Sequence, residues 1–166
     1  ICPLGAIHMI YMEEEGFYRP SLNLSKCVEC GKCLNACPAN HQNTTSLMGN
    51  FRALYLAHAT DDHVRHWATS GGVINALVRY LLDKKIVEAV LMTGYCEDSH
   101  IEAQPYLLTC DNVTILTENP RDFASRYVTV PILEKIKEVS QMSSIAVVGT
   151  PCQITALKYM GGVFVT

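Results

Sequence analysis

The sequence predicts an α+β protein, in which a small cysteine-rich module is followed by an α/β domain with a mixed sheet. Two observations lead to this prediction. Five of the eight cysteines lie before residue 38, and from residue 61 onward apolar strand patterns alternate with helical ones. We therefore expect a first module at 1–40, a polar linker at 41–52 and a second domain at 53–166.

The first module begins with two short segments of strand composition, at 6–12 and 17–24. Between them lies the polar stretch Glu13-Glu14-Glu15-Gly16, whose glycine suits the backbone angles of a tight turn. The pattern predicts a two-stranded hairpin that leads into a run of cysteines.

A helical pattern in the second domain follows Ser70, Gly71 and Gly72, and Ser70 is its expected N-cap. The apolar residues that share one face of this helix are expected to be buried. They are Val73, Ile74, Leu77, Tyr80 and Leu81. The opposite, polar face carries Asn75, Arg79 and Asp83.

The remaining elements of the second domain are predicted from composition and periodicity. We expect strands at 53–60, 89–93 and 145–148, a hairpin of 106–109 and 113–116 that turns at Asp111-Asn112, and helices at 132–139 and 152–159. Alternation of strands and helices at this spacing indicates a mostly parallel or mixed sheet.

The cysteines of CVECGKCLNACP carry the strongest chemical signal in the chain. Cys27, Cys30, Cys33 and Cys37 have the spacing C-x2-C-x2-C-x3-C and are followed by Pro38, which matches the bacterial ferredoxin run. Two-residue gaps let one tight loop supply three thiolates to a [4Fe–4S] cluster. The pattern therefore predicts a ferredoxin-like iron–sulfur module.

The fourth ligand of this cluster is expected to come from elsewhere. In two-cluster ferredoxins the fourth cysteine of each run binds the other cluster, and Cys2-Pro3 resembles the end of a truncated first run. We assign Cys27, Cys30, Cys33 and Cys2 to one cluster, and Cys37 to a second. The start at Ile1 rather than Met leads us to expect an excerpt of a longer protein.

Zinc and disulfides are the alternatives for these cysteines. Zinc sites usually use paired C-x2-C knuckles separated by a longer loop, which four cysteines in eleven residues do not resemble. Their close spacing favours metal binding over disulfides and predicts a reducing, cytoplasmic compartment.

Charge and hydropathy exclude two classes of function. A net charge of −3 gives no basic patch for nucleic acid, and no apolar run approaches the roughly 20 residues of a transmembrane helix. The six histidines are scattered and we expect them to be structural or exposed, with Trp67 in the core.

Three segments of the second domain suggest ligand binding, although each has a simpler explanation. Thr69-Ser70-Gly71-Gly72 could receive a phosphate or merely begin a helix. Arg126-Tyr127 could pair with a phosphate and stack on a ring, or be a solvated Arg and a core Tyr. Cys152, in VGTPCQ, could be a reactive thiol at a helix start or a buried structural cysteine.

Together and in this order, the three segments resemble the coenzyme F420 hydrogenase/dehydrogenase beta-subunit family. The matching stretches are SGGVINALVRYLLDKKIVEAVLMTG, QPYLL, SRYVTVP and VVGTPCQITALK, preceded by a ferredoxin module as in many members. The resemblance implies an oxidoreductase in which FAD passes electrons between [4Fe–4S] clusters and a hydride carrier, expected to be coenzyme F420. It also implies that 53–166 is the N-terminal part of a flavin-binding domain.

The resemblance also implies which residues bind the cofactors. The flavin-site candidates are Ser70, Gly71, Gly72, Arg126, Tyr127, Thr150 and Pro151. Cys152 matches a cysteine that ligates a further cluster. Arg126 departs from the family pattern, because a Lys is common there and Arg changes the contact geometry.

Two other functions remain open. Similar proteins reduce tetrapyrroles in chlorophyll metabolism, which would keep the fold and change the substrate. A ferredoxin-like relay subunit would bind no flavin and only connect two partners. In each case we expect a redox partner, either another subunit or a ferredoxin.

Overall fold

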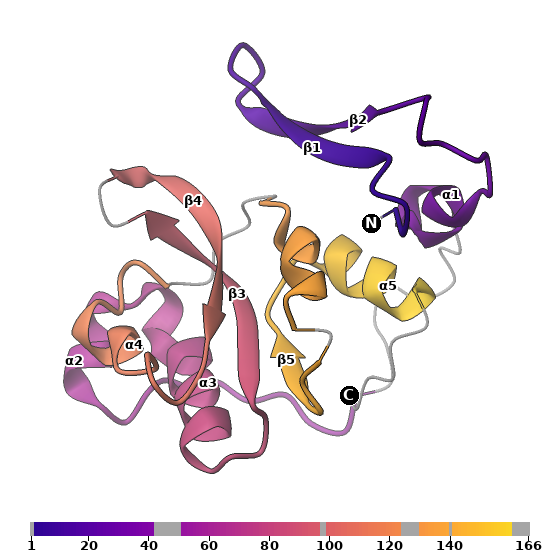
Figure 1. The fold of residues 1–166 in the computed structure, drawn as a ribbon. Helices are drawn as coiled ribbons and strands as arrows, with labels where there is room; N and C mark the ends of the chain where they lie inside the picture. The colour runs from indigo at the N-terminus through magenta and orange to yellow at the C-terminus, as the bar shows by residue number, and fades with distance from the viewer. Residues whose placement is uncertain (1, 42–50, 97–98, 124–129, 140, 161–166) are drawn as a thin grey trace. The chain divides into compact units, whose positions relative to one another are not determined.

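The computed structural model describes residues 2–41, 51–96, 99–123, 130–139 and 141–160 (Figure 1). They separate into two compact units. One comprises Ile1–Leu54 with Thr150–Thr166, and the other comprises Tyr55–Gly149.

The first unit begins with the predicted hairpin. Strands β1 (Ile7–Met12) and β2 (Phe17–Leu22) pair antiparallel, from Ile7 opposite Leu22 to Met12 opposite Phe17. The Gly16 N–H donates to Met12 O at 2.8 Å, and Gly16 adopts a φ of 70° that closes the turn. The composition of the two strands and of their turn thus predicted this element correctly.

Helical segments complete the first unit. They are α1 (Lys32–Ala36), η1 (Pro38–Asn40) and α5 (Pro151–Tyr159). α5 contacts both α1 and η1, and the rings of His41 and Tyr159 lie 4.4 Å apart. The helix predicted at 152–159 is therefore present, and it groups with the cysteine-rich segment although the sequence division assigned it to the second domain.

The second unit is built on a three-stranded mixed sheet of order β4-β3-β5. β3 (Ala89–Cys96) pairs antiparallel with β4 (Ser99–Leu108) and parallel with β5 (Ile145–Val147). This architecture confirms the predicted mixed sheet and the strands expected near 89–93 and 145–148.

The hairpin predicted from 106–109 and 113–116 is wrong. The Asn112 side chain accepts the Thr109 N–H at 2.7 Å and donates to Leu107 O at 3.2 Å. This turn runs directly into α4 (Ile115–Glu118), so that 113–116 is not a strand and β4 takes β3 as its partner.

Two further predictions need correction. The described residues at 53–60 form no strand, because no neighbouring strand pairs with them and Leu54, Tyr55 and Leu56 remain exposed. Near 132–139 the chain forms a 3₁₀ helix, η3 (Ile132–Lys137), instead of an α-helix.

Helices cover the sheet on both faces. Figure 1 shows α2 (Asp62–Trp67), α3 (Val73–Asp83) and α4 on one side of the β3–β4 pair. Val90 and Met92 point into the core cluster on that side, while Ala89 and Leu91, also buried, point to the opposite face. η3 contacts β3 and β4 there. The other residues of the hydrophobic core cluster that contains Val90 and Met92 are Val78, Leu82, Leu108, Val113, Leu116 and Phe123.

The buried face of α3 agrees with the predicted one only in part, since Ile74 packs against the core cluster but two other predicted residues do not. Asn75, Val78 and Leu82 are buried, whereas Leu77 and Tyr80 are 52% and 54% exposed. Asn75, which we expected on the polar face, is buried and donates to Leu116 O and Pro120 O in the neighbouring segment. Trp67, expected in the core, is 45% exposed and carries the Arg121 guanidinium 4.9 Å from its ring centre.

Candidate metal centre and cofactor residues

Four cysteines of the first unit surround one cavity of about 280 Å³. They are Cys2, Cys27, Cys30 and Cys33, the four that we assigned to a single cluster. Most of the other lining residues are apolar: Pro3, Leu4, Ala6, Ile7, Leu22, Val28 and Leu34. Glu29 and Lys32 add one charge of each sign. The cavity combines thiols with mostly apolar walls, and Cys30 and Cys33 are exposed.

The backbone on both sides of Cys30 is left-handed. Glu29 and Gly31 have φ of 51° and 70°, in the left-handed region, on either side of Cys30. Residues in the left-handed region are part of the anion-binding concavities of backbone N–H groups that occur in many iron–sulfur sites.

The turn after Cys2 acts in the same way on its sulfur. A hydrogen bond from the Ala6 backbone N–H is the main cause that lowers the pKa of the Cys2 thiol, with smaller contributions from Leu4 and Gly5. The turn is fixed by the Gly5 N–H, which donates to Cys2 O at 3.0 Å, and by the Asn23 N–H, which donates to Ala6 O at 2.8 Å. The lowered pKa raises the proportion of thiolate, the form that binds iron, at Cys2.

The arrangement fits a [4Fe–4S] cluster better than a zinc ion. Among the described residues, no group of three or more His, Cys, Asp or Glu side chains could hold a single metal ion. A zinc ion needs its sulfurs about 2.3 Å from one centre, whereas the four cysteines here surround a wider cavity.

Cys37 and Cys152 lie outside this cavity. Cys37 is exposed between α1 and η1, and its N–H donates to Leu34 O at 3.3 Å. Cys152 is exposed in the first turn of α5, with its Sγ 3.1 Å from Thr150 Oγ1. The structure thus brings together four of the six candidate ligands.

Thr150 and Pro151 have a structural role that the sequence reading missed. Thr150 is the N-cap of α5 and forms a capping box with Gln153, whose Oε1 accepts the Thr150 N–H at 2.9 Å. Pro151 occupies the first helical position, where its missing N–H costs nothing. The Thr-x-x-Gln spacing was a visible signal for this cap.

The turn at Ser70, Gly71 and Gly72 is left-handed throughout, with φ of 56°, 75° and 73°. Ser70 is not the N-cap of α3, because the helix begins at Val73 and Gly72 takes that position. A Cβ on Gly72 would lie 2.7 Å from Val64 Cγ1. Gly72 is therefore required by packing within the protein, whether or not a ligand binds.

The candidate flavin-binding residues lie in different parts of the chain. Arg126 and Tyr127 lie outside the described residues. Ser70, Gly71 and Gly72 belong to the second unit, and Thr150 and Pro151 belong to the first. Ser70 is exposed, and α3 begins without a side-chain cap, so its first amides have no side-chain acceptor.

Comparisons with known proteins agree with the resemblance. Residues 54–137 match the family model of the coenzyme F420 hydrogenase/dehydrogenase beta subunit, N-terminal part. Residues 1–41 match the 4Fe-4S dicluster domain. This second match supports an iron–sulfur cluster in the ferredoxin-like module and agrees with the α+β architecture.

Two curated proteins are similar to the chain over about two thirds of its length. The chain is 27% identical over 110 residues to coenzyme F420 hydrogenase subunit beta of Methanococcus voltae, covering 66% of this chain and 38% of that protein. It is 31% identical over 103 residues to F420-dependent formate dehydrogenase subunit beta of Methanocaldococcus jannaschii, covering 62% and 26%. The chain thus spans well under half the length of these relatives.

A solved structure also resembles part of the chain. It is a chain of the F420-reducing [NiFe] hydrogenase complex from Methanosarcina barkeri, with a TM-score of 0.49 and 21% identity. The match covers 61% of this chain and 34% of that one. Separately, none of the helices in the described part of the chain is long and apolar enough to cross a membrane.

Proposed function

Because the chain belongs to the coenzyme F420 hydrogenase/dehydrogenase beta-subunit family, we propose that it passes electrons between [4Fe–4S] clusters and coenzyme F420 by way of FAD. The observation that carries the proposal is the cavity surrounded by Cys2, Cys27, Cys30 and Cys33. It precedes, in one chain, a domain whose curated relatives are named as subunits of F420-dependent enzymes.

The need for FAD follows from the two electron carriers. A deazaflavin exchanges a hydride, whereas a cubane accepts one electron at a time, and bound FAD supplies the conversion between the two. The protein's own contribution is to bind and orient these groups. Its cysteines hold the cluster, and the backbone N–H groups beside Cys2 stabilise thiolate charge on that sulfur.

For the flavin, the described residues support a phosphate contact at the start of α3. The helix has eleven residues and no side-chain cap, so no side-chain acceptor competes with a phosphate for its first N–H groups. Ser70 is exposed beside this start, whereas Gly72 acts by letting the backbone pack against Val64. Gly71, Arg126, Tyr127, Thr150 and Pro151 remain candidates from the resemblance.

Anaerobic purification tests the proposal directly. We expect extraction to release FAD, and the protein to exchange electrons with coenzyme F420. Ser70→Asp should weaken FAD binding through charge repulsion while the iron content stays unchanged, because Asp tolerates the left-handed backbone at this position. The matched variant Thr69→Asp, at the exposed neighbouring position, should retain more FAD. Full FAD retention in Ser70→Asp, or loss of iron from it, would contradict the proposal that Ser70 lies beside the flavin and apart from the cluster.

A relay subunit without flavin is the second candidate. It is favoured by the local explanations for two of the motifs, namely the packing of Gly72 against Val64 and the capping box of Thr150 and Gln153. The absence of any extractable flavin from the iron-loaded protein, together with retained one-electron transfer to a ferredoxin, would establish this reading. Reduction of a tetrapyrrole with no response to coenzyme F420 would instead indicate the third function.

A further inference from the structure

Trp67, at the end of α2, is the only tryptophan of the chain and is 45% exposed. Three side chains that carry or can carry positive charge lie close to its ring. The Arg121 Cζ is 4.9 Å from the ring centre, and the ring centres of His66 and His63 are 5.0 and 6.5 Å from it. All four residues belong to the second unit. Tryptophan and arginine exposed together are typical of binding surfaces.

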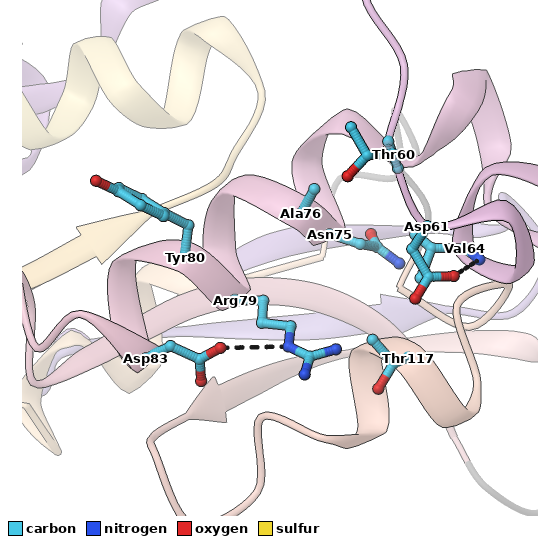
Figure 2. Close-up of a pocket in the computed structure, with 10 residues that line it drawn as sticks. Thr60, Asp61, Val64, Asn75, Ala76, Arg79, Tyr80, Asp83 and Thr117 are labelled. Atoms are coloured by element: carbon cyan, nitrogen blue, oxygen red, sulfur yellow. Dashed lines mark hydrogen bonds and ion pairs between the residues drawn. The ribbon is translucent and has the colours of Figure 1, made fainter.

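Two features hold α2 so that this ring stays at the surface. Asp61 caps the helix, and its Oδ1 accepts the Val64 N–H at 3.0 Å, as the dashed line between these residues in Figure 2 shows. Val64 and Ala68 pack with Ala59 in a small buried cluster. Because the helix is anchored through Val64, the exposed Trp67 cannot turn inward without breaking this cluster.

The backbone that carries Arg121 is also fixed, on both sides. The preceding Pro120 is buried, and its carbonyl oxygen accepts a hydrogen bond from Asn75 Nδ2 at 3.1 Å. The carbonyl oxygen of the following, half-buried Asp122 accepts the Tyr95 N–H at 3.0 Å. Arg121 itself is exposed, and no carboxylate of the described residues forms an ion pair with it. Its guanidinium is therefore positioned by the indole and not by an acid.

The chemistry of this position suits a phosphate. A guanidinium that rests on an aromatic ring can still offer two N–H donors to phosphate oxygens. The last turn of α2 adds Arg65 and His66, whereas the carboxylates of Asp61 and Asp62 belong to the opposite end of the helix. Positive groups thus gather at the end that carries Trp67.

The turn proposed to contact the flavin lies next to this group. α2 ends at Trp67, and η2 (Thr69–Gly72) begins two residues later and contacts α2. Three residues of chain span at most about 11 Å, so the Cα atoms of Trp67 and Ser70 lie within that distance of each other. A dinucleotide is long enough to contact both places.

We propose that Arg121, positioned by Trp67, binds the pyrophosphate of FAD together with the start of α3. In this arrangement Arg121 is a binding residue and Trp67 is a positioning residue. The inference rests on the proposed function for the identity of the ligand. The chemistry assigned to Arg121 is testable by itself, with inorganic pyrophosphate as the probe.

Titration of the iron-loaded chain, reconstituted without flavin, with sodium pyrophosphate at constant ionic strength tests the proposal. Because Trp67 is the only tryptophan, its fluorescence reports on this site, and we expect a saturable change. Arg121→Gln should weaken binding by at least about tenfold, because a charge-assisted hydrogen bond is lost. The matched variant Arg65→Gln removes the same charge from an exposed position in the last turn of α2 and should bind normally.

Substitution of Trp67 tests its positioning role, with calorimetry in place of fluorescence because the tryptophan is removed. Trp67→Ala should weaken pyrophosphate binding. Trp67→Phe should restore most of the affinity, because it keeps an aromatic ring beneath the guanidinium. Equal affinities of the two variants would contradict a positioning role for this ring.

The proposal is overturned if pyrophosphate gives no saturable change, or if Arg65→Gln weakens binding as much as Arg121→Gln, which would indicate diffuse attraction. FAD extraction from the natively purified protein separates this result from the proposed function. FAD in the parent, together with its loss from Arg121→Gln, supports both proposals. Pyrophosphate binding through Arg121 in a chain that yields no FAD would contradict the proposed function and support the anion site alone.

Discussion

Glu29 and Gly31, on either side of Cys30, both hold left-handed backbone angles, and only one of them is a glycine. A side chain in this region costs about 1–2 kcal/mol, because its Cβ crowds the following carbonyl oxygen. Glu29 therefore bears a local strain beside the metal centre that Gly31 avoids. Such strain persists where the surrounding structure requires a particular backbone direction.

Removing the glycine at position 31 and introducing one at position 29 should change the free energy of unfolding in opposite directions. Gly31→Ala should lower the free energy of unfolding by about 1 kcal/mol, purely through the backbone, because nothing lies within 4 Å of the added Cβ. Glu29→Gly should preserve stability or raise it. Urea unfolding of the iron-loaded protein measures both. An unchanged free energy of unfolding in Gly31→Ala would show that the loop relaxes out of the left-handed conformation.

Cysteine substitutions test whether Cys2 or Cys37 completes the cluster of Cys27, Cys30 and Cys33. Cys2→Ser should lower the iron bound per chain sharply, because Cys2 lines the cavity with Cys27, Cys30 and Cys33. Cys37→Ser, an exposed residue outside the cavity, should leave iron and the visible absorption of the cluster unchanged. Iron analysis after anaerobic reconstitution measures the difference. The reverse pattern would assign Cys37 to the first cluster in place of Cys2.

At the scale of single elements, the sequence predicted best those features that depend on neighbours along the chain. The turn at Gly16 and the spacing of the cysteines are local patterns, and the structure shows the hairpin and the grouped cysteines. The buried face of α3 depends instead on hydrogen bonds from Asn75 to carbonyls 41 and 45 residues away. No pattern within the helix could indicate that partner.

The start of α3 provides a test at this scale. Gly72→Ala should destabilise the protein by about 2–4 kcal/mol, since the new Cβ would be strained at a φ of 73° and would lie 2.7 Å from Val64 Cγ1. Ser70→Gly, in the same turn, should be neutral or stabilising because it relieves a left-handed serine.

Thermal unfolding of the two variants in parallel measures this contrast. Equal stability of Gly72→Ala and the parent would show that the turn is not packed as described. The same reasoning explains why a substitution at Gly72 cannot report on flavin binding alone, and why the exposed Ser70 is the better position for that purpose.

At the scale of the whole molecule, the alternation of strands and helices predicted a mixed sheet, and β4-β3-β5 is one. The grouping of α5 with the cysteine-rich segment was not predictable. It rests on contacts such as that between His41 and Tyr159, which are distant in sequence. The strand expected at 53–60 is absent for a related reason. A segment of strand composition forms a strand only where another strand can pair with it.

The central claim is that the N-terminal thiolates hold an iron–sulfur cluster. Anaerobic reconstitution of the chain with iron and sulfide, followed by elemental analysis and electron paramagnetic resonance of the reduced sample, tests it most directly. We expect about four iron and four sulfide per chain, together with the signal of a reduced [4Fe–4S] cluster. Stoichiometric zinc without acid-labile sulfide in the natively purified protein would contradict it.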